Sequence, residues 1–196
     1  MTRIIKLALI LSLVGAASVS SSALAASAAE IDVRVSETIE SFKKQVNGAE
    51  VFLQQASGYL VFPKVYKVGV GIGGETGEGA LRIGNTNVDY YRTSSGSFGF
   101  QLGAQARSIV IVFMTEESLN KFRNSEGWKV GIDGSVALVD LGAGKTIDSK
   151  KIKDPVVGFI FGSKGLMYNL NLEGTKKHKI DKRGSADKDE EKDTEA

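Results

Sequence analysis

The first regular pattern of hydrophobic positions in the chain has the period of a helix. Five apolar residues recur at steps of three or four, with polar residues between them: Ile31, Val35, Ile39, Phe42 and Val46. This spacing predicts an amphipathic helix. A short second helix is expected through Phe52, Leu53 and Ala56, ending at Ser57–Gly58.

A third helix is predicted directly after Thr115. This residue is a suitable N-cap, acidic residues follow it in the first turn, and basic residues occupy the last turn, which complements the helix dipole. Leu119 and Phe122 are expected on its buried side.

Between the second and third helices the hydrophobic period changes to two, which predicts strands. The stretch "YLVFP" is expected to be a strand that stops at Pro63. In "YKVGVGIGG" one face of a strand is apolar, through Tyr66, Val68, Val70 and Ile72, and the other face is Lys67 followed by glycines. The following "GETGEG" is expected to turn the chain into a further strand, "ALRIG".

The remaining alternating segments complete a sheet. "VDYYRT" is a short strand, and the alternation from Phe98 runs into "IVIVFM", the expected central strand. Alternation resumes from Trp128 to Leu138, and "VVGFIFGSKGLMYNLNLEG" predicts a hairpin that turns at Ser163-Lys164-Gly165. Roughly seven strands and two or three helices without regular β-α-β alternation predict an α+β fold. We expect an antiparallel, strongly twisted sheet or partly closed barrel packed with the helices.

The N-terminal residues have the layout of a secretory signal peptide. Arg3 and Lys6 precede an apolar run that is too short to span a bilayer, and small residues follow it. Ala23 and Ala25 suit a signal peptidase, so residues 1–25 are expected to be removed and the protein to reside in the periplasm or cell envelope. An uncleaved anchor is the alternative. The chain has no cysteine, which excludes a disulfide and a lipid attached at a lipobox cysteine.

Charge divides the rest of the chain into a domain and a tail. Without Arg3 and Lys6, 23 basic residues balance 23 acidic ones, so the mature chain is formally neutral. Residues 181–196 are rich in charge and have no large apolar residue, which predicts a disordered tail. Residues 26–180 then form one mildly basic domain, too weakly charged to indicate a nucleic-acid partner.

Two glycine-rich segments resemble nucleotide-binding motifs without meeting their requirements. Gly69, Gly71 and Gly74 have the spacing G-x-G-x-x-G, but no helix can start in the residues that follow. "LGAGKT" ends like a P-loop, yet Val139 stands where that motif needs a glycine. We therefore expect no nucleotide and no other cofactor. The glycines are interpreted as a face that lets a helix or a large aromatic side chain approach the sheet closely.

Catalytic and metal-binding residues are sparse. His178 is the only histidine, and with no cysteine the usual zinc ligand sets are excluded. A Ser-His-Asp triad would depend on this one residue, which we interpret as a solvated surface residue. Glu75, Glu78 and Asp89 form no motif of calcium or hydrolase spacing. An enzyme is therefore not expected.

Four blocks together resemble the SYLF-domain family across about residues 30–180: "SGYLVFPKVYKVGVGIGGETGEGAL", "SFGFQLGAQARSIVIVFMTEESLNKF", "WKVGIDGSVA" and "GFIFGSKGLMYNLNLEG". The resemblance implies a non-enzymatic domain that binds anionic lipid surfaces, in eukaryotic members partly through an N-terminal amphipathic helix and basic residues. The chain departs from the family where Glu37 and Glu40 lie beside the lysines of that helix, and in "DYYRTSS".

The expected function is that of an exported lipid-binding or membrane-associating domain whose partner is an anionic phospholipid surface. The candidate lipid-binding residues are Lys43, Lys44, Lys64, Lys67, Lys176, Lys177 and Lys179. The alternative is a structural or stress-related envelope protein that binds another protein or peptidoglycan, with the first helix merely covering the sheet.

Overall fold

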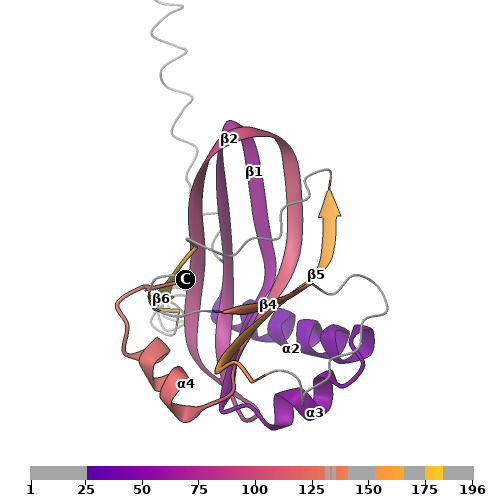
Figure 1. Cartoon of the computed structure of the whole chain (residues 1–196), viewed down its shortest axis with the longest axis vertical. Helices are drawn as coiled ribbons and strands as arrows, with labels where there is room; N and C mark the ends of the chain where they lie inside the picture. Colours follow the sequence, from indigo (N-terminus) through magenta and orange to yellow (C-terminus); the bar gives the residue numbers. More distant parts are fainter. Residues whose placement is uncertain (1–25, 131–132, 134–135, 141–152, 166–174, 183–196) are drawn as a thin grey trace, which may run out of the picture.

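The computed structural model describes residues 26–130, 133, 136–140, 153–165 and 175–182. In these residues three helices pack against a curled, mostly antiparallel sheet, an α+β fold (Figure 1). The elements are α2 (Ala28–Gln45), α3 (Ala49–Gln54), β1 (Gly58–Ile83), β2 (Thr86–Phe113), α4 (Glu116–Arg123), β3 (Trp128–Lys129), β4 (Ala137–Asp140), β5 (Val156–Gly165) and β6 (Lys176–Ile180). The expected signal peptide and most of the expected tail lie outside the described residues.

The sheet is organised around β2, which confirms the prediction of a central strand. The strand order is β3-β6-β2-β5-β4, and β1 also pairs with β2. All pairs are antiparallel except β4 with β5, which is parallel and departs from the wholly antiparallel expectation.

The strands β1 and β2 form one long hairpin that bends over on itself. They pair from Gly58 with Phe113 to Ile83 with Thr86, and the chain reverses at Gly84, which has φ +57°. In Figure 1 this ribbon arches away from the helices, which lie at the other end of the molecule. We call the helix end the base, and residues 64–79 of β1 with residues 92–107 of β2 the arch.

The predicted turn in the glycine-rich stretch is wrong, because β1 continues through it. A Cβ atom added at Gly79 would lie 1.9 Å from the carbonyl oxygen of Val61, and one at Gly77 would lie 2.7 Å from that of Lys64. The two halves of β1 therefore pass each other at backbone contact. Glycine permits a close approach, as expected, but the neighbour is the first half of the same strand.

Pro63 does not stop the strand; it marks a β-bulge. Phe62 pairs with Ile109 and Val65 pairs with Arg107, so two residues of β1 face the single residue Ser108. The Ser108 hydroxyl donates a hydrogen bond to the Pro63 carbonyl at 2.9 Å. Because side chains alternate between faces, this extra residue exchanges the inner and outer faces of β1.

Two apolar cores stabilise the base, one on each face of the sheet. The helices α2 and α3 cover the outer face, where Phe42, Val61 and Phe159 are fully buried. On the inner face Phe113 stacks on Phe122 of α4, with ring centroids 4.8 Å apart, and Trp128 packs edge-on against Phe122. The two faces of the base are therefore both closed to water.

The three predicted helices are confirmed, as is the predicted cap at Thr115, although α3 ends at Gln54 before the predicted Ala56. The Ser27 hydroxyl accepts the Glu30 N–H at 3.2 Å at the start of α2, and Thr115 accepts the Ser118 N–H at 3.2 Å at the start of α4. Each bond satisfies a backbone donor that the first turn leaves unpaired. The predicted buried side of α4, Leu119 with Phe122, is also confirmed.

Two further strand predictions are corrected. Residues 163–165 do not turn, because they continue β5 and Gly165 pairs with Gln105 of β2. The segment from Trp128 to Leu138 is not one strand: its first part pairs with β6 and its last part pairs with β5. The chain turns between them, where the Asp133 carboxylate accepts the Lys129 N–H at 2.6 Å.

Candidate lipid-binding surface

Beyond the bulge, β1 presents apolar side chains to solvent. Tyr66, Val68 and Ile72 are 50%, 56% and 69% exposed, and we call them the outer strip. Their face continues the one that α2 and α3 cover in the base. The Lys64 ammonium lies 5.0 Å from the centre of the Tyr66 ring. An exposed apolar strip with an aromatic ring and an adjacent cation is typical of an interaction surface.

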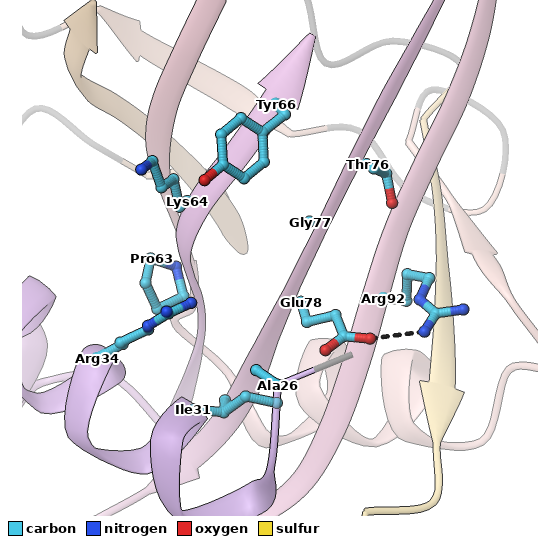
Figure 2. Close-up of a pocket in the computed structure, with 10 residues that line it drawn as sticks. All are labelled: Ala26, Ile31, Arg34, Pro63, Lys64, Tyr66, Thr76, Gly77, Glu78 and Arg92. Carbon is cyan, nitrogen blue, oxygen red and sulfur yellow. Dashed lines mark hydrogen bonds and ion pairs between the residues drawn. The ribbon is translucent and has the colours of Figure 1, made fainter. Parts of the chain in front are cut away.

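A cavity of about 360 Å³ adjoins the outer strip (Figure 2). Arg34 of α2, Lys64 and Tyr66 of the first half of β1, Glu78 of its second half and Arg92 of β2 line it. The bend of β1 is what brings its two halves to the same cavity. Side chains from far apart in the sequence therefore converge beside the strip.

Positive charge predominates around this cavity. Arg34 pairs with Glu30, while Glu78 pairs with Arg92 at 2.6 Å and with Lys182 at 3.1 Å. Burial acts to raise the pKa of Glu78, but the contacts and charges of Arg92 and Lys182 outweigh it and lower that pKa, so the carboxylate stays ionised. The lining itself holds three cations, Arg34, Lys64 and Arg92, and one carboxylate, that of Glu78. Lys64 forms no ion pair with any described residue.

The predicted helix lysines do not lie beside an available apolar face. Lys43 pairs with Glu40 at 3.1 Å, and Lys44 is exposed. The apolar stripe of α2 is buried in the outer core, where Val35 and Phe42 are 0% exposed. The first helix is therefore packed against the sheet and does not offer its apolar stripe to a bilayer.

The three predicted lysines of β6 point in different directions. Lys176 is exposed, Lys179 is exposed and pairs with Asp89 at 2.6 Å, and Lys177 is 1% exposed. Because neighbouring residues of a strand alternate between faces, they cannot form one patch. Among the seven candidate lysines, Lys64 is the one that lines the cavity beside the outer strip.

Lys67 and Lys177 are buried, which corrects their assignment to the surface. Lys67 is 8% exposed, and the Lys177 ammonium donates to the Thr93 hydroxyl at 2.9 Å and the Thr175 hydroxyl at 2.6 Å. Burial lowers the pKa of Lys177 to about 7. Lys67 lies inside the arch because the bulge at Pro63 reverses the faces of β1. Lys177 comes from β6 and is held inside by the Thr93 and Thr175 hydroxyls.

These lysines belong to an interior polar cluster that the sequence pattern did not indicate. Its members are Lys67, Glu75, Thr93, Gln105, Arg107, Thr175 and Lys177. Arg107 and Glu75 form an ion pair at 2.6 Å with side chains 0% and 2% exposed. An ion pair at this depth is costly to desolvate and indicates that the two halves of the arch meet in one defined arrangement.

Among the described residues there is no group of side chains suited to a metal ion and no helix suited to span a membrane. No three His, Cys, Asp or Glu side chains among them are grouped as metal ligands would be. No helix in the described ranges is both long and apolar enough to cross a bilayer. His178, expected at the solvated surface near the tail, is partly buried in β6.

Sequence reasoning missed the exposure of the outer strip and the contribution of Arg34, Glu78 and Arg92. Pro63 carries the signal that could have found them, because a proline inside a strand is confined to edges, strand starts and bulges. A bulge at Pro63 would have assigned Tyr66 to the outer face and Lys67 to the inner face.

These features define a class: a curled half-barrel α+β domain with an apolar strip and a cation-lined cavity on one surface. Residues 94–187 match the family described as Ysc84, Las17-binding protein actin regulator. This match supports assignment of the chain to the SYLF-domain family, which is a family of lipid-binding and actin-regulating domains and is not known as enzymatic. The comparison with curated proteins gave no match. The matched residues include β6 but not the outer strip.

Proposed function

We propose that this protein is an exported, non-enzymatic domain that associates with lipid surfaces carrying anionic headgroups. The observation that carries the proposal is the outer strip of exposed apolar side chains beside a cavity in which cations predominate. Export is supported by the signal-peptide layout of residues 1–25. The periplasm or cell envelope is the compartment that this layout implies.

The energetics favour weak, reversible association. Burying the exposed area of Tyr66, Val68 and Ile72 in the interfacial region contributes about 25 cal/mol per Å² of apolar surface. Each cation near an anionic surface adds about 1 kcal/mol, which salt screens. Both contributions are needed, since a strip of three side chains is small and the cavity cations are partly paired.

The apolar contribution is tested by co-sedimentation with vesicles of phosphatidylcholine, with and without phosphatidylglycerol. We expect Val68→Ser combined with Ile72→Ser to lose most of the binding to anionic vesicles. The matched control is Val33→Ser combined with Val51→Ser, because these valines are 59% and 52% exposed on helices away from the strip. The control should bind like the unchanged protein.

The charge contribution is tested with the same vesicles at low and high salt. Lys64→Glu should weaken binding to anionic vesicles and leave the weak binding to neutral ones unchanged. Lys43→Glu combined with Lys44→Glu should have a smaller effect, because these lysines lie on α2 outside the lining of the cavity. Equal absence of binding to both vesicles by folded protein would overturn the proposal and favour a protein or peptidoglycan partner.

A further inference from the structure

The fold fixes the backbone at Ala26, the first described residue. Its carbonyl oxygen accepts a hydrogen bond from the Lys182 ammonium at 2.9 Å, and Lys182 is only 8% exposed. Ser27 follows as the N-cap of α2. Ala26 also lines the cavity beside the outer strip (Figure 2). The backbone therefore enters the folded domain at the wall of this cavity.

Glu78, on the same cavity, divides its carboxylate between two cations. Its Oε1 accepts from Arg92 at 2.6 Å. Its Oε2 is buried and lies 3.1 Å from the Lys182 ammonium, whose contact and charge help to lower the pKa of Glu78. A carboxylate oxygen can accept more than one hydrogen bond, so Oε2 can take a second donor. Lys182 touches both Glu78 and Ala26, so the two residues lie close together.

The sequence predicts that a signal peptidase cleaves after Ala25, which would create a free α-ammonium group on Ala26. We propose that this new amino terminus is a working part of the cavity: the α-ammonium group of Ala26 donates a hydrogen bond to Oε2 of Glu78 and adds one positive charge to the cavity wall. The hydrogen bond depends on the fold and on cleavage after Ala25, which belongs to the proposed function. The role of the added charge rests on the proposed function.

Cleavage would then change the site as well as the location of the protein. Before cleavage the Ala26 nitrogen is an uncharged peptide nitrogen with a single N–H. After cleavage the nitrogen carries a charge and three N–H donors. The cavity of the processed chain therefore has one more cation, and the cavity itself should attract anionic surfaces more strongly.

The contact is tested by comparing chains that begin at Ala26 and at Ala25. Every described element lies within residues 26–182, so both chains contain the whole described fold. The extra alanine displaces the ammonium group by up to about 3.8 Å while keeping its charge. The nearby cations Arg34, Arg92 and Lys182 act to lower the α-amino pKa, whereas the Glu78 carboxylate, as the direct acceptor, acts to raise it. With the hydrogen bond formed, NMR titration should give the Ala26 chain an α-amino pKa above the value of about 7.7 to 8.0 for an unstructured terminus. The Ala25 chain should not show this rise.

Glu78→Gln is the second arm, because it removes the negative charge and keeps the shape of the side chain. The α-amino pKa of the Ala26 chain should then return to the ordinary value, and its melting temperature advantage over the Ala25 chain, about 2 to 4 °C, should disappear. A partner that raises the α-amino pKa stabilises the fold below pH 8, and this gain is lost as the pH rises through the folded-state pKa. An ordinary α-amino pKa in the Ala26 chain would overturn the inference.

Binding to phosphatidylglycerol vesicles and to inorganic phosphate separates the inference from the proposed function. Stronger vesicle binding by the Ala26 chain supports both, and phosphate binding alone assigns the cavity to free anions, which overturns the lipid function. A raised α-amino pKa without vesicle binding by either chain supports the contact and overturns the proposed function. Acetylation of the Ala26 amino terminus removes its charge. Unchanged vesicle binding after acetylation overturns the role of the added charge.

Discussion

The base and the arch of the same hairpin have opposite distributions of apolar and charged side chains. In the base, Val61 faces one apolar core and Phe62 faces the other. In the arch, the ion pair of Glu75 with Arg107 is inside, and Val68 is 56% exposed outside. In the first half of β1, the bulge at Pro63 separates these two distributions. An apolar strand face therefore marks a core only where another element covers it.

This difference divides the work of the molecule. The base has two closed apolar cores, which are the main source of folding free energy. The arch encloses charged groups, whose desolvation opposes folding, and exposes apolar ones that contribute nothing in solution. Stability in the base thus permits a surface in the arch that is adapted to binding. Three changes test this division, from the largest expected effect on stability to the smallest.

Gly79→Val should remove the contact through which the two halves of β1 pass each other. Its Cβ would lie 1.9 Å from the Val61 carbonyl oxygen, and that oxygen is backbone and cannot rotate away. Ordinary overpacking costs about 1 to 3 kcal/mol. Here we expect a loss of more than about 4 kcal/mol in the free energy of unfolding, measured by urea denaturation.

Gly96→Val is the control for that substitution. Gly96 lies in the arch on β2, and a Cβ atom there meets nothing within 4 Å. Its variant should unfold within about 0.5 kcal/mol of the unchanged protein. Similar losses at Gly79 and Gly96 would mean that the close approach does not set the cost, since β-propensity favours valine over glycine at both sites.

The sequence predicts the base well because the base obeys local rules. The cap at Thr115 and the apolar stripe of α2 are short-range signals, and the structure confirms them. The turn near Gly84 was missed because the glycines at Gly77 and Gly79 gave a stronger turn signal. Gly77 and Gly79 instead contact the backbone of residues 61–65. A contact between segments this far apart in the sequence cannot be predicted from local composition.

The candidate site was predicted less well for a similar reason. Lysines were assigned to the surface because lysine is rarely buried without a partner. Lys177 has such partners, Thr93 and Thr175, but both come from other parts of the sheet. Lys64 is basic, exposed and in the lining of the cavity. Whether it binds lipid stays a prediction. Which lysines are free to meet a ligand depends on hydrogen bonds and ion pairs formed with residues distant in the sequence.

The pH dependence of stability tests the interior of the arch. Burial lowers the pKa of Lys177 from 10.5 to about 7, with Glu75 acting to raise it and Arg107 to lower it. Between these two pH values the unfolded chain binds more protons than the folded one, so stability rises with pH across this window. The slope is at most about 1.4 kcal/mol per pH unit. Lys177→Met should remove this slope, as urea denaturation at pH 7 to 10 would show.

If the free energy of unfolding of the unchanged protein stays level from pH 7 to 10, the pKa of Lys177 is not lowered by burial. Retention of the slope in Lys177→Met would assign it to another group. Tyr91 cannot be that group: burial raises its pKa from 10.0 to about 12, so the folded chain keeps a proton that the unfolded chain loses, and stability falls with pH across that higher window.

The same substitution at two valines gives the smallest effect and the most direct comparison of base with arch. Val→Thr keeps the shape of the side chain and adds a hydroxyl group. At Val61, 0% exposed in the outer core, the hydroxyl finds no water and should cost about 1 to 3 kcal/mol. At Val68, 56% exposed on the outer strip, it stays hydrated and should change the free energy of unfolding by less than about 0.5 kcal/mol. Both residues are valines on outer faces of β1, so propensity is matched and only coverage by α2 and α3 differs. Equal costs at the two sites would mean that Val68 is covered in solution, for example by a second copy of the chain, and the outer strip would then not be free to meet a lipid surface.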